Sequence, residues 1–138
     1  MKKPWDLRDR TMEFAVAVFR FCRTLPKTDE ARDVARQLRR SASSVAANYR
    51  ASRRGKSHAD FASKIGTVIE EADESLFWLE FLVRVELAHR SATKSMAGEA
   101  NELICVFTAA QKTARSRSRV SPKASRKRSA FSVEVSEV

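Results

Sequence analysis

Residues 70–74 contain four carboxylates, which makes this short segment the part of the chain best spaced for chemistry. Carboxylates at such spacing could hold metal ions between helices. Di-metal sites in helix bundles add a Glu-x-x-His motif on each of two helices. The chain has two histidines, His58 and His89, which are too few for a histidine-based site of the ordinary kind. We therefore expect no metal ion and no organic cofactor.

The chain also lacks the common motifs of covalent and phosphate-transfer catalysis. It contains no Gly-rich phosphate loop, no His-Glu-x-x-His and no Gly-x-Ser-x-Gly sequence. Ser57 and Ser91 lie near the two histidines, but both stand where a helix is expected to begin. Serine at such a position caps the backbone. We expect no catalytic residue and no enzyme activity.

Basic side chains gather in two places and predict binding of a polyanion. The net charge of +10 and the pI near 10.3 favour nucleic-acid or ribosomal partners. One group lies within seven positions, and the other follows the last expected helix. The two groups are Arg50, Arg53, Arg54 and Lys56, and Arg115, Arg117, Arg119, Lys123, Arg126, Lys127 and Arg128. The competing interpretation is that these charges only keep a turn and a tail solvated.

Two neighbouring arginines, Arg39 and Arg40, have a structural interpretation. If the chain turns around Gly55 and Lys56, antiparallel register places one or both of them within reach of carboxylates. These carboxylates are Glu70, Glu71 and Glu74. We expect a polar network between the two helices, which would specify their register if it is buried.

A second apolar strip accompanies the main stripe of the third expected helix. It consists of Phe77, Trp78, Phe81 and Val85. Stacking on bases is disfavoured, because the surrounding residues are acidic and would repel phosphates. Trp and Phe are favoured in interface cores, so we expect this strip to form a homo-oligomer interface. Packing inside the monomer is the competing interpretation.

Four amphipathic helices are expected to position these residues. Apolar side chains recur at steps of three and four residues, and Phe19 and Cys22 are expected to widen the first buried stripe. Pro26 and Gly55 mark two helix ends, and Thr28 or the residue after it can cap the second helix. The four stripes span residues 7–25, 31–49, 61–83 and 96–114.

The sequence predicts an all-α fold, an up-down-up-down antiparallel four-helix bundle over residues 1–115. With only 3 Gly and 3 Pro in 138 residues, a turn-rich β-sandwich or barrel is excluded. Residues 116–138 are basic, rich in serine and unpatterned. We expect them to form a disordered basic C-terminal tail.

Cysteine usage and hydropathy predict a cytoplasmic protein. Cys22 and Cys105 are isolated, which is typical of a reducing compartment. No apolar run approaches the ~18 residues of a membrane span, and residues 1–6 lack the apolar core of a signal peptide. We expect no membrane contact.

Two segments carry a resemblance to a known family. They are residues 37–48 (QLRRSASSVAAN) and 71–80 (EADESLFWLE), which accompany the Leu25–Pro26 loop. Together they resemble the four-helix bundle protein family, also called the 23S ribosomal RNA intervening-sequence protein family, over about residues 5–114. The family often continues after the Asn with Ile-Ala-Glu-Gly, where this chain has Tyr49-Arg50-Ala51-Ser52, which makes the end of the second helix more basic.

The resemblance implies a small bacterial bundle, often a ring-shaped homopentamer, without an established enzyme activity. The family is also similar to the accessory variability protein of diversity-generating retroelements, which binds a reverse transcriptase and nucleic acid. We therefore expect a non-enzymatic homo-oligomer that binds nucleic acid, RNA rather than DNA. The alternative is a protein–protein adaptor that presents its acidic and aromatic face to a reverse transcriptase or a ribosomal component.

Overall fold

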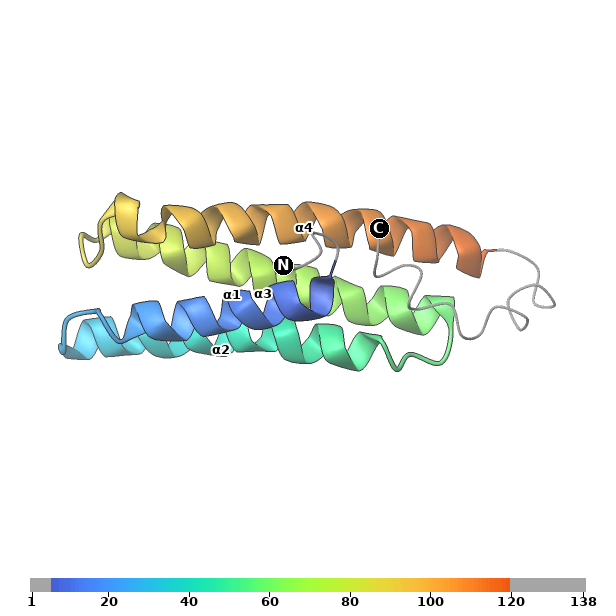
Figure 1. Ribbon diagram of the computed structural model, residues 1–138, viewed down its shortest axis with the longest axis horizontal. Coiled ribbons are helices and arrows are strands. Elements are labelled where there is room, and N and C mark those ends of the chain that lie inside the picture. Colours follow the sequence, from blue (N-terminus) through green and yellow to red (C-terminus); the bar gives the residue numbers. More distant parts are fainter. Residues whose placement is uncertain (1–5, 120–138) are drawn as a thin grey trace.

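The computed structural model describes residues 6–119, which form four antiparallel helices (Figure 1). The helices are α1 (Leu7–Cys22), α2 (Asp29–Ser52), α3 (His58–Arg84) and α4 (Arg90–Ser118). No strand occurs within residues 6–119. The predicted all-α, up-down-up-down bundle is confirmed. The expectation of disorder in the tail concerns mainly residues 120–138, which lie outside the described range.

Side-chain caps begin three of the four helices. Asp6, Thr28 and Ser57 each accept a hydrogen bond from the backbone N–H three residues further on, which satisfies a donor that has no partner within the helix. The residue before α4 is His89, whose side chain makes no capping bond. Ser91, which the sequence suggested as a cap, lies inside the first turn of α4.

Two helix ends differ from the sequence-based boundaries. α1 ends at Cys22, and Leu25 is buried in the turn that follows. α4 continues to Ser118, so residues 116–118 are helical and not part of the predicted tail. No helix breaker occurs before Pro122, and the Ser118 hydroxyl donates to the Arg115 carbonyl at 2.8 Å. The last turns of α4 therefore carry part of the second basic group.

The helices differ in length, and α1 is much the shortest. It has 16 residues, whereas α2, α3 and α4 have 24, 27 and 29. At 1.5 Å per residue, α1 spans roughly 24 Å and α4 roughly 43 Å. α1 therefore lies along only part of the bundle, and the ends of α2, α3 and α4 extend beyond its first turn (Figure 1).

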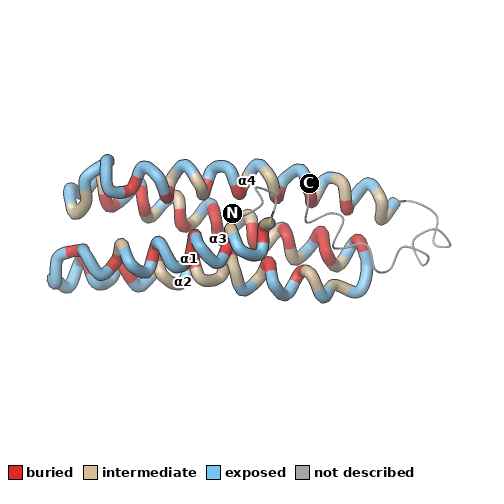
Figure 2. Tube along the Cα trace, in the orientation of Figure 1, coloured by how far each residue is buried: buried red, intermediate tan, exposed pale blue. Residues whose placement is uncertain are grey.

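One continuous core runs along the inside of the bundle (Figure 2). In the half beyond the first turn of α1, three large aromatic side chains fill it. They are Tyr49, Phe61 and Phe107, each at most 1% exposed, and the Tyr49 and Phe107 ring centroids lie 5.3 Å apart. Where α2 meets α3, the Ser75 hydroxyl donates to the Ser41 hydroxyl at 2.9 Å. This buried pair fits a turn around Gly55 to within about one helical turn.

An ion pair ties α1 to α4. The Arg10 guanidinium donates to both carboxylate oxygens of Glu99, at 3.0 and 2.7 Å, and to Glu102 at 3.2 Å. A bidentate pair of this kind adds geometric specificity as well as energy. Beside it, α1 and α4 border an open cleft of about 710 Å³, with Phe14 and Met96 among its walls. Three further ion pairs, Arg32 with Asp29, Arg36 with Asp33 and Lys64 with Asp60, each lie within one helix.

Two helical glycines allow a matched test of packing. An added Cβ at Gly98 meets nothing within 4 Å, whereas one at Gly66 meets the Gln111 amide nitrogen at 2.9 Å. Gly in a helix interior costs roughly 0.5–1 kcal/mol relative to Ala. We therefore expect Gly98→Ala to raise the free energy of unfolding by about that amount. Gly66→Ala should gain less, because Gln111 must move and strain its hydrogen bond to the Ala62 carbonyl. Urea unfolding of both variants measures the difference, and equal gains would contradict the packing at Gly66.

Candidate nucleic-acid interface

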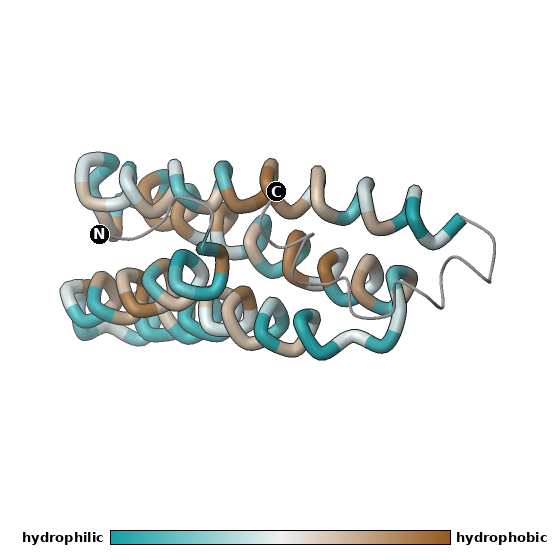
Figure 3. The backbone as a smooth tube through the Cα atoms, turned by 45° about the vertical axis from the view of Figure 1, so that its right-hand side comes forward, coloured by the Kyte–Doolittle hydropathy of each residue, from teal (hydrophilic) through white to brown (hydrophobic). Residues whose placement is uncertain are grey.

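Antiparallel packing brings three helix ends together at one end of the bundle. The last turns of α2 and α4 and the first turn of α3 lie there (Figure 1). Figure 3 shows hydrophilic residues along the α2–α3 connection and the last turns of α4. Residues 46–66 and 106–119 contain nine basic side chains, which we call the basic end. They are Arg50, Arg53, Arg54, Lys56, Lys64, Lys112, Arg115, Arg117 and Arg119.

Most of these side chains reach solvent. Arg50, Arg54 and Lys56 of the hairpin are exposed, and Arg53 is half-buried. On α4, Arg115 is exposed, as are the cations at 112 and 119, while the arginine at 117 is half-buried. The structure therefore brings the two predicted basic groups to one end as far as residue 119. The predicted contacts of Lys123, Arg126, Lys127 and Arg128 lie outside the described residues.

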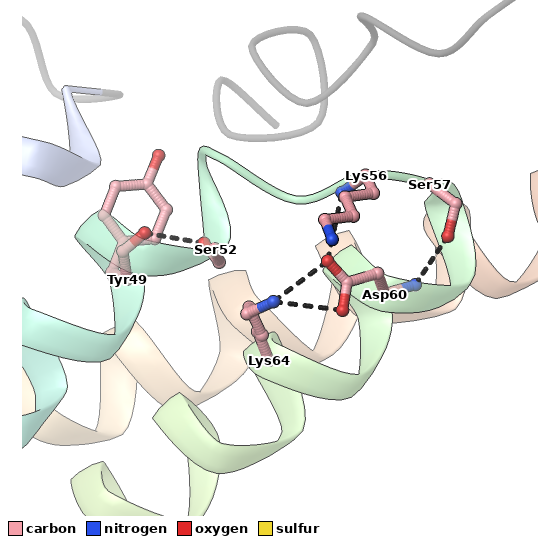
Figure 4. A network of polar contacts seen from close by, with 6 residues as sticks. All are labelled: Tyr49, Ser52, Lys56, Ser57, Asp60 and Lys64. Atoms are coloured by element: carbon pink, nitrogen blue, oxygen red, sulfur yellow. Dashed lines mark hydrogen bonds and ion pairs between the residues drawn. The ribbon is translucent and has the colours of Figure 1, made fainter.

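Asp60 is the one carboxylate in these two segments, and it is bound to basic neighbours (Figure 4). The Lys64 ammonium donates to both of its oxygens, at 3.0 and 2.9 Å, and the backbone N–H of Lys56 donates to Oδ2 at 3.0 Å. The hydrogen bond from Lys64 is the first cause that lowers the pKa of Asp60. Its charge is therefore compensated locally, so it offsets little of the field of the surrounding arginines.

The hairpin loop is held close to this carboxylate by a glycine. An added Cβ at Gly55 would lie 3.1 Å from the Ser52 carbonyl oxygen and 3.2 Å from Asp60 Oδ2. Beneath the loop, the Ser52 hydroxyl donates to the Tyr49 carbonyl at 2.6 Å (Figure 4), and His58 is buried. The backbone that bears the exposed arginines of the hairpin is therefore closely packed against the residues beneath it.

Arg39 and Arg40, which were expected to form one network with carboxylates of α3, have different neighbours in the structure. The guanidinium carbon of Arg39 lies 6.0 Å from the Phe19 ring centroid on α1, because the core stripe of α2 turns residue 39 toward that side. Partial burial raises the pKa of Glu71, and the positive charge of Arg40 opposes that shift without reversing it. No ion pair joins either arginine to an α3 carboxylate within residues 6–119. The expectation of α3 carboxylates opposite Arg39 is therefore corrected.

The carboxylates of the predicted network carry an electrostatic cost. Partial burial is the first cause that raises the pKa of Glu71, and the negative charges of Glu74 and Glu70 raise it further. Glu74 has a partner, since its Oε2 accepts a hydrogen bond from the Trp78 indole at 3.2 Å. Within residues 6–119, no three His, Cys, Asp or Glu side chains form a group that could hold a metal ion.

One Glu-x-x-His spacing does occur in the sequence, at Glu86 and His89. Glu86 follows α3 and has a φ of 65°, and His89 is the residue before α4. Helical di-metal sites present this motif from within helices, so these two residues do not supply one. None of the four helices is long and apolar enough to cross a membrane, over the residues described.

The second apolar strip lies on the outer face of α3. Phe77, Phe81 and Val85 are 52%, 36% and 41% exposed, and Trp78 is half-buried. The three rings pack on one another, with centroids 4.8 to 5.9 Å apart. Packing inside the bundle therefore leaves much of this strip in contact with solvent. The interpretation that it serves only the monomer core does not fit Phe77.

Sequence reasoning missed a second exposed apolar surface, on α1. Met12, Val16 and Phe19 are 54%, 39% and 40% exposed. Phe19 was expected to widen the buried stripe of this helix, but it lies at its edge beneath Arg39. The signal was present as the i, i+4, i+7 spacing of these three residues beside the core positions.

The family model described as 23S rRNA-intervening sequence protein matches residues 4–109. This chain belongs to the 23S rRNA-intervening sequence protein family. A crystal structure from Bacteroides thetaiotaomicron VPI-5482, described as a protein with unknown function from the S23 ribosomal protein family, is 29% identical with a TM-score of 0.70. The similarity covers 77% of this chain and 98% of that one. No curated protein matches the chain significantly.

The family match divides the basic end. The hairpin cations from Arg50 to Lys64 lie within the matched residues, whereas those at 112, 115, 117 and 119 follow its end at residue 109. The bundle of the 23S rRNA-intervening sequence protein family thus provides the hairpin, and the C-terminal turns of α4 add charge beyond the matched region.

The raised pKa of Glu71 predicts that the stability of the fold depends on the ionisation of this side chain. Its ionised form is less favourable in the fold than in the unfolded chain, so ionisation destabilises the fold at neutral pH. We expect Glu71→Gln to raise the melting temperature at pH 7. The corresponding gain in the free energy of unfolding should be less than about 1 kcal/mol, because the site is partly exposed. The gain should vanish below the ordinary glutamate pKa of about 4. Thermal melts from pH 3.5 to 7 test this, and a gain that does not depend on pH would contradict it.

Proposed function

We propose that this protein is a non-enzymatic, homo-oligomeric four-helix bundle that binds nucleic acid through its basic end and C-terminal segment. The observation that supports this proposal is the clustering of basic side chains where three helix ends come together. Nine basic side chains meet there with one carboxylate, Asp60, which is paired with Lys64. Clustered cations of this kind release counterions when they bind a phosphate backbone, and this release favours binding.

The distribution of charge over the rest of the molecule also favours binding of a polyanion at the basic end. Residues 67–105 contain eight carboxylates and only three basic residues. Five of these carboxylates and one of these basic residues, Arg84, lie on α3, so a polyanion is repelled from the outer face of α3 and attracted to the basic end. This polarity orients the encounter before any specific contact forms.

We propose RNA as the ligand, with little sequence specificity. The described aromatic residues at the basic end, Tyr49, Phe61 and Phe107, are all buried, so they offer no platform on which bases could stack. Binding then depends on phosphates, which carry no sequence information. The preference for RNA over DNA rests on the family, which is described by its link to 23S rRNA.

A charge-reversal experiment tests the basic end. We expect Arg50→Glu with Arg54→Glu to weaken binding of a fluorescent single-stranded RNA more than tenfold at low salt. The plot of log affinity against log salt should also flatten, since each lost phosphate contact reduces the slope by about 0.7. Fluorescence anisotropy of the full-length chain at several salt concentrations measures both effects.

The matched control is Arg32→Glu with Arg36→Glu. These arginines are also exposed on α2, but near its first turn, at the opposite end of the bundle. The control makes the same change in net charge and should reduce affinity much less. If both variants lose affinity equally, only net charge matters. If the unaltered chain does not bind at low salt, the nucleic-acid proposal is wrong.

We propose that assembly uses two different faces of the bundle. The α3 strip of Phe77, Trp78, Phe81 and Val85 is flanked by acidic residues. The α1 surface has a net positive surrounding, in which Arg8, Arg20, Arg23 and Arg39 outnumber Asp9 and Glu13. Apolar faces with opposite charges complement one another between two copies. A contact between unlike faces repeats around a ring when its rotation closes, which agrees with the pentamer that the family resemblance implies.

Substitutions on each face test the assembly. We expect Phe77→Glu and Met12→Glu each to convert the oligomer to monomer, because each places a charge in an apolar contact. Ala47→Glu, on the exposed side of α2, is the control and should leave the mass unchanged. Light scattering at micromolar concentration measures the mass, and circular dichroism checks that helicity is retained. A monomeric unaltered chain would exclude the proposed assembly.

The second candidate function is that of a protein–protein adaptor. The exposure of Phe77 and Phe81 favours it, because large apolar side chains left in solvent mark interaction surfaces. A reverse transcriptase or a ribosomal protein could then occupy the outer face of α3. A chain that stays monomeric and does not bind RNA in the two preceding experiments would support this function over the first.

A further inference from the structure

A groove lies between the last turns of α3 and the first turns of α4, at the end of the bundle opposite the basic end (Figure 1). Its volume is about 500 Å³, within the range of about 300–1,000 Å³ that is typical of small-molecule sites. Residues between 79 and 84 of α3 and between 90 and 97 of α4 line it. We call it the α3–α4 groove.

Three cations line this groove, namely Arg84 of α3 and Arg90 and Lys94 of α4. They are all the basic residues between positions 67 and 105, a region that also contains eight carboxylates. Glu80 is the one carboxylate among the lining residues. The fold therefore gathers the few cations of an acidic region at one place, and the groove has a net positive charge.

No ion pair within residues 6–119 neutralises these cations. Glu80 and Arg84 stand four positions apart on one helix, a spacing that allows an ion pair, yet none joins them. Arg90 and Lys94 have the same spacing, at which like charges repel. The first turn of α4 contains no acidic residue, so the positive end of the helix dipole adds to the field. An anion in the groove would relieve this repulsion.

Apolar side chains form the less exposed part of the groove. Leu79 is buried, and Val83 and Ala97 are half-buried. Thr93 is 4% exposed and lines the groove as well, and its hydroxyl donates to the Arg90 carbonyl at 3.3 Å. A ligand could therefore place an apolar group against these side chains while its charged group contacts the cations.

We propose that the α3–α4 groove binds a small phosphate monoester that carries an apolar group. Such a phosphate has a charge of about −1.5 to −2 at neutral pH, which matches three cations beside one carboxylate. The guanidinium forks of Arg84 and Arg90 suit phosphate oxygens. A polynucleotide fits less well, because the carboxylates at residues 70–74 of α3 would repel its further phosphates.

The groove is separate from the surfaces to which the proposed function assigns a role. The basic end lies at the other end of the bundle. None of the four residues of the α3 strip lines the groove, so a ligand there does not use the face proposed for contact between copies. The site therefore stands independently of nucleic-acid binding and of assembly.

Phosphorus NMR with phenyl phosphate and inorganic phosphate as probes tests the apolar part of the site. We expect phenyl phosphate to bind the full-length chain roughly fivefold more tightly, because its ring is removed from water. Ala97→Leu should fill the apolar part of the groove and abolish this difference, while leaving the affinity for inorganic phosphate unchanged. Equal affinity of the unaltered chain for the two probes, or a difference that survives in Ala97→Leu, would overturn the proposal.

A matched pair of double variants tests the charged part. We expect Arg84→Gln with Arg90→Gln to weaken phenyl phosphate binding roughly tenfold at low salt, because two charge-assisted contacts are lost. The control, Arg32→Gln with Arg36→Gln, removes the same charge from exposed positions of α2 at the same end of the bundle and should leave the affinity unchanged. Circular dichroism checks that both variants remain helical. Equal loss in the two variants, or loss in neither, contradicts the proposal.

RNA binding by the same variants separates this site from the proposed function. The two double variants should have equal affinity for single-stranded RNA, since both alter positions away from the basic end. A loss of RNA affinity confined to Arg84→Gln with Arg90→Gln would identify a polynucleotide as the occupant, and the small-ester proposal would be wrong. If no chain binds RNA while the groove variant alone loses phenyl phosphate, only the proposed function is wrong.

Discussion

The antiparallel alternation of the helices is the constraint on which the surfaces of this molecule depend. Each helix buries one apolar stripe, and loops of a few residues force each helix to return beside the one before it. The end of α2, the start of α3 and the end of α4 must then share one end of the bundle. Basic groups separated by about sixty positions in the sequence become neighbours for this reason alone.

The same alternation separates opposite charges. The basic end has nine cations, and its one carboxylate, Asp60, is held by Lys64. Most carboxylates of α3 lie beyond residue 69, a distance along the helix of roughly 18 Å from its start. This distance exceeds the screening length of about 8 Å at physiological salt. The two regions can therefore attract different partners without cancelling each other.

The short first helix determines where the bundle needs additional support. α1 is held to α2 by apolar packing and to α4 by the bidentate pair of Arg10 with Glu99. Beyond its first turn, Tyr49, Phe61 and Phe107 fill the core between the longer helices. The rigid support beneath the hairpin arginines is therefore provided by α2, α3 and α4, and α1 is left to present an exposed apolar surface of its own.

The sequence alone determined the four helices, their order, and the register of α2 on α3 to within about a turn. These properties follow from the spacing of apolar residues and from short loops, which act over a few residues. The group of hairpin cations could also be predicted from the sequence, since its members lie within seven positions of one another. Tertiary structure alone decided that the end of α4 joins them, that Arg39 turns to Phe19, and that Arg10 pairs with Glu99. Each of these depends on how one helix is rotated against another, and the periodicity of a single helix does not specify its partner's rotation.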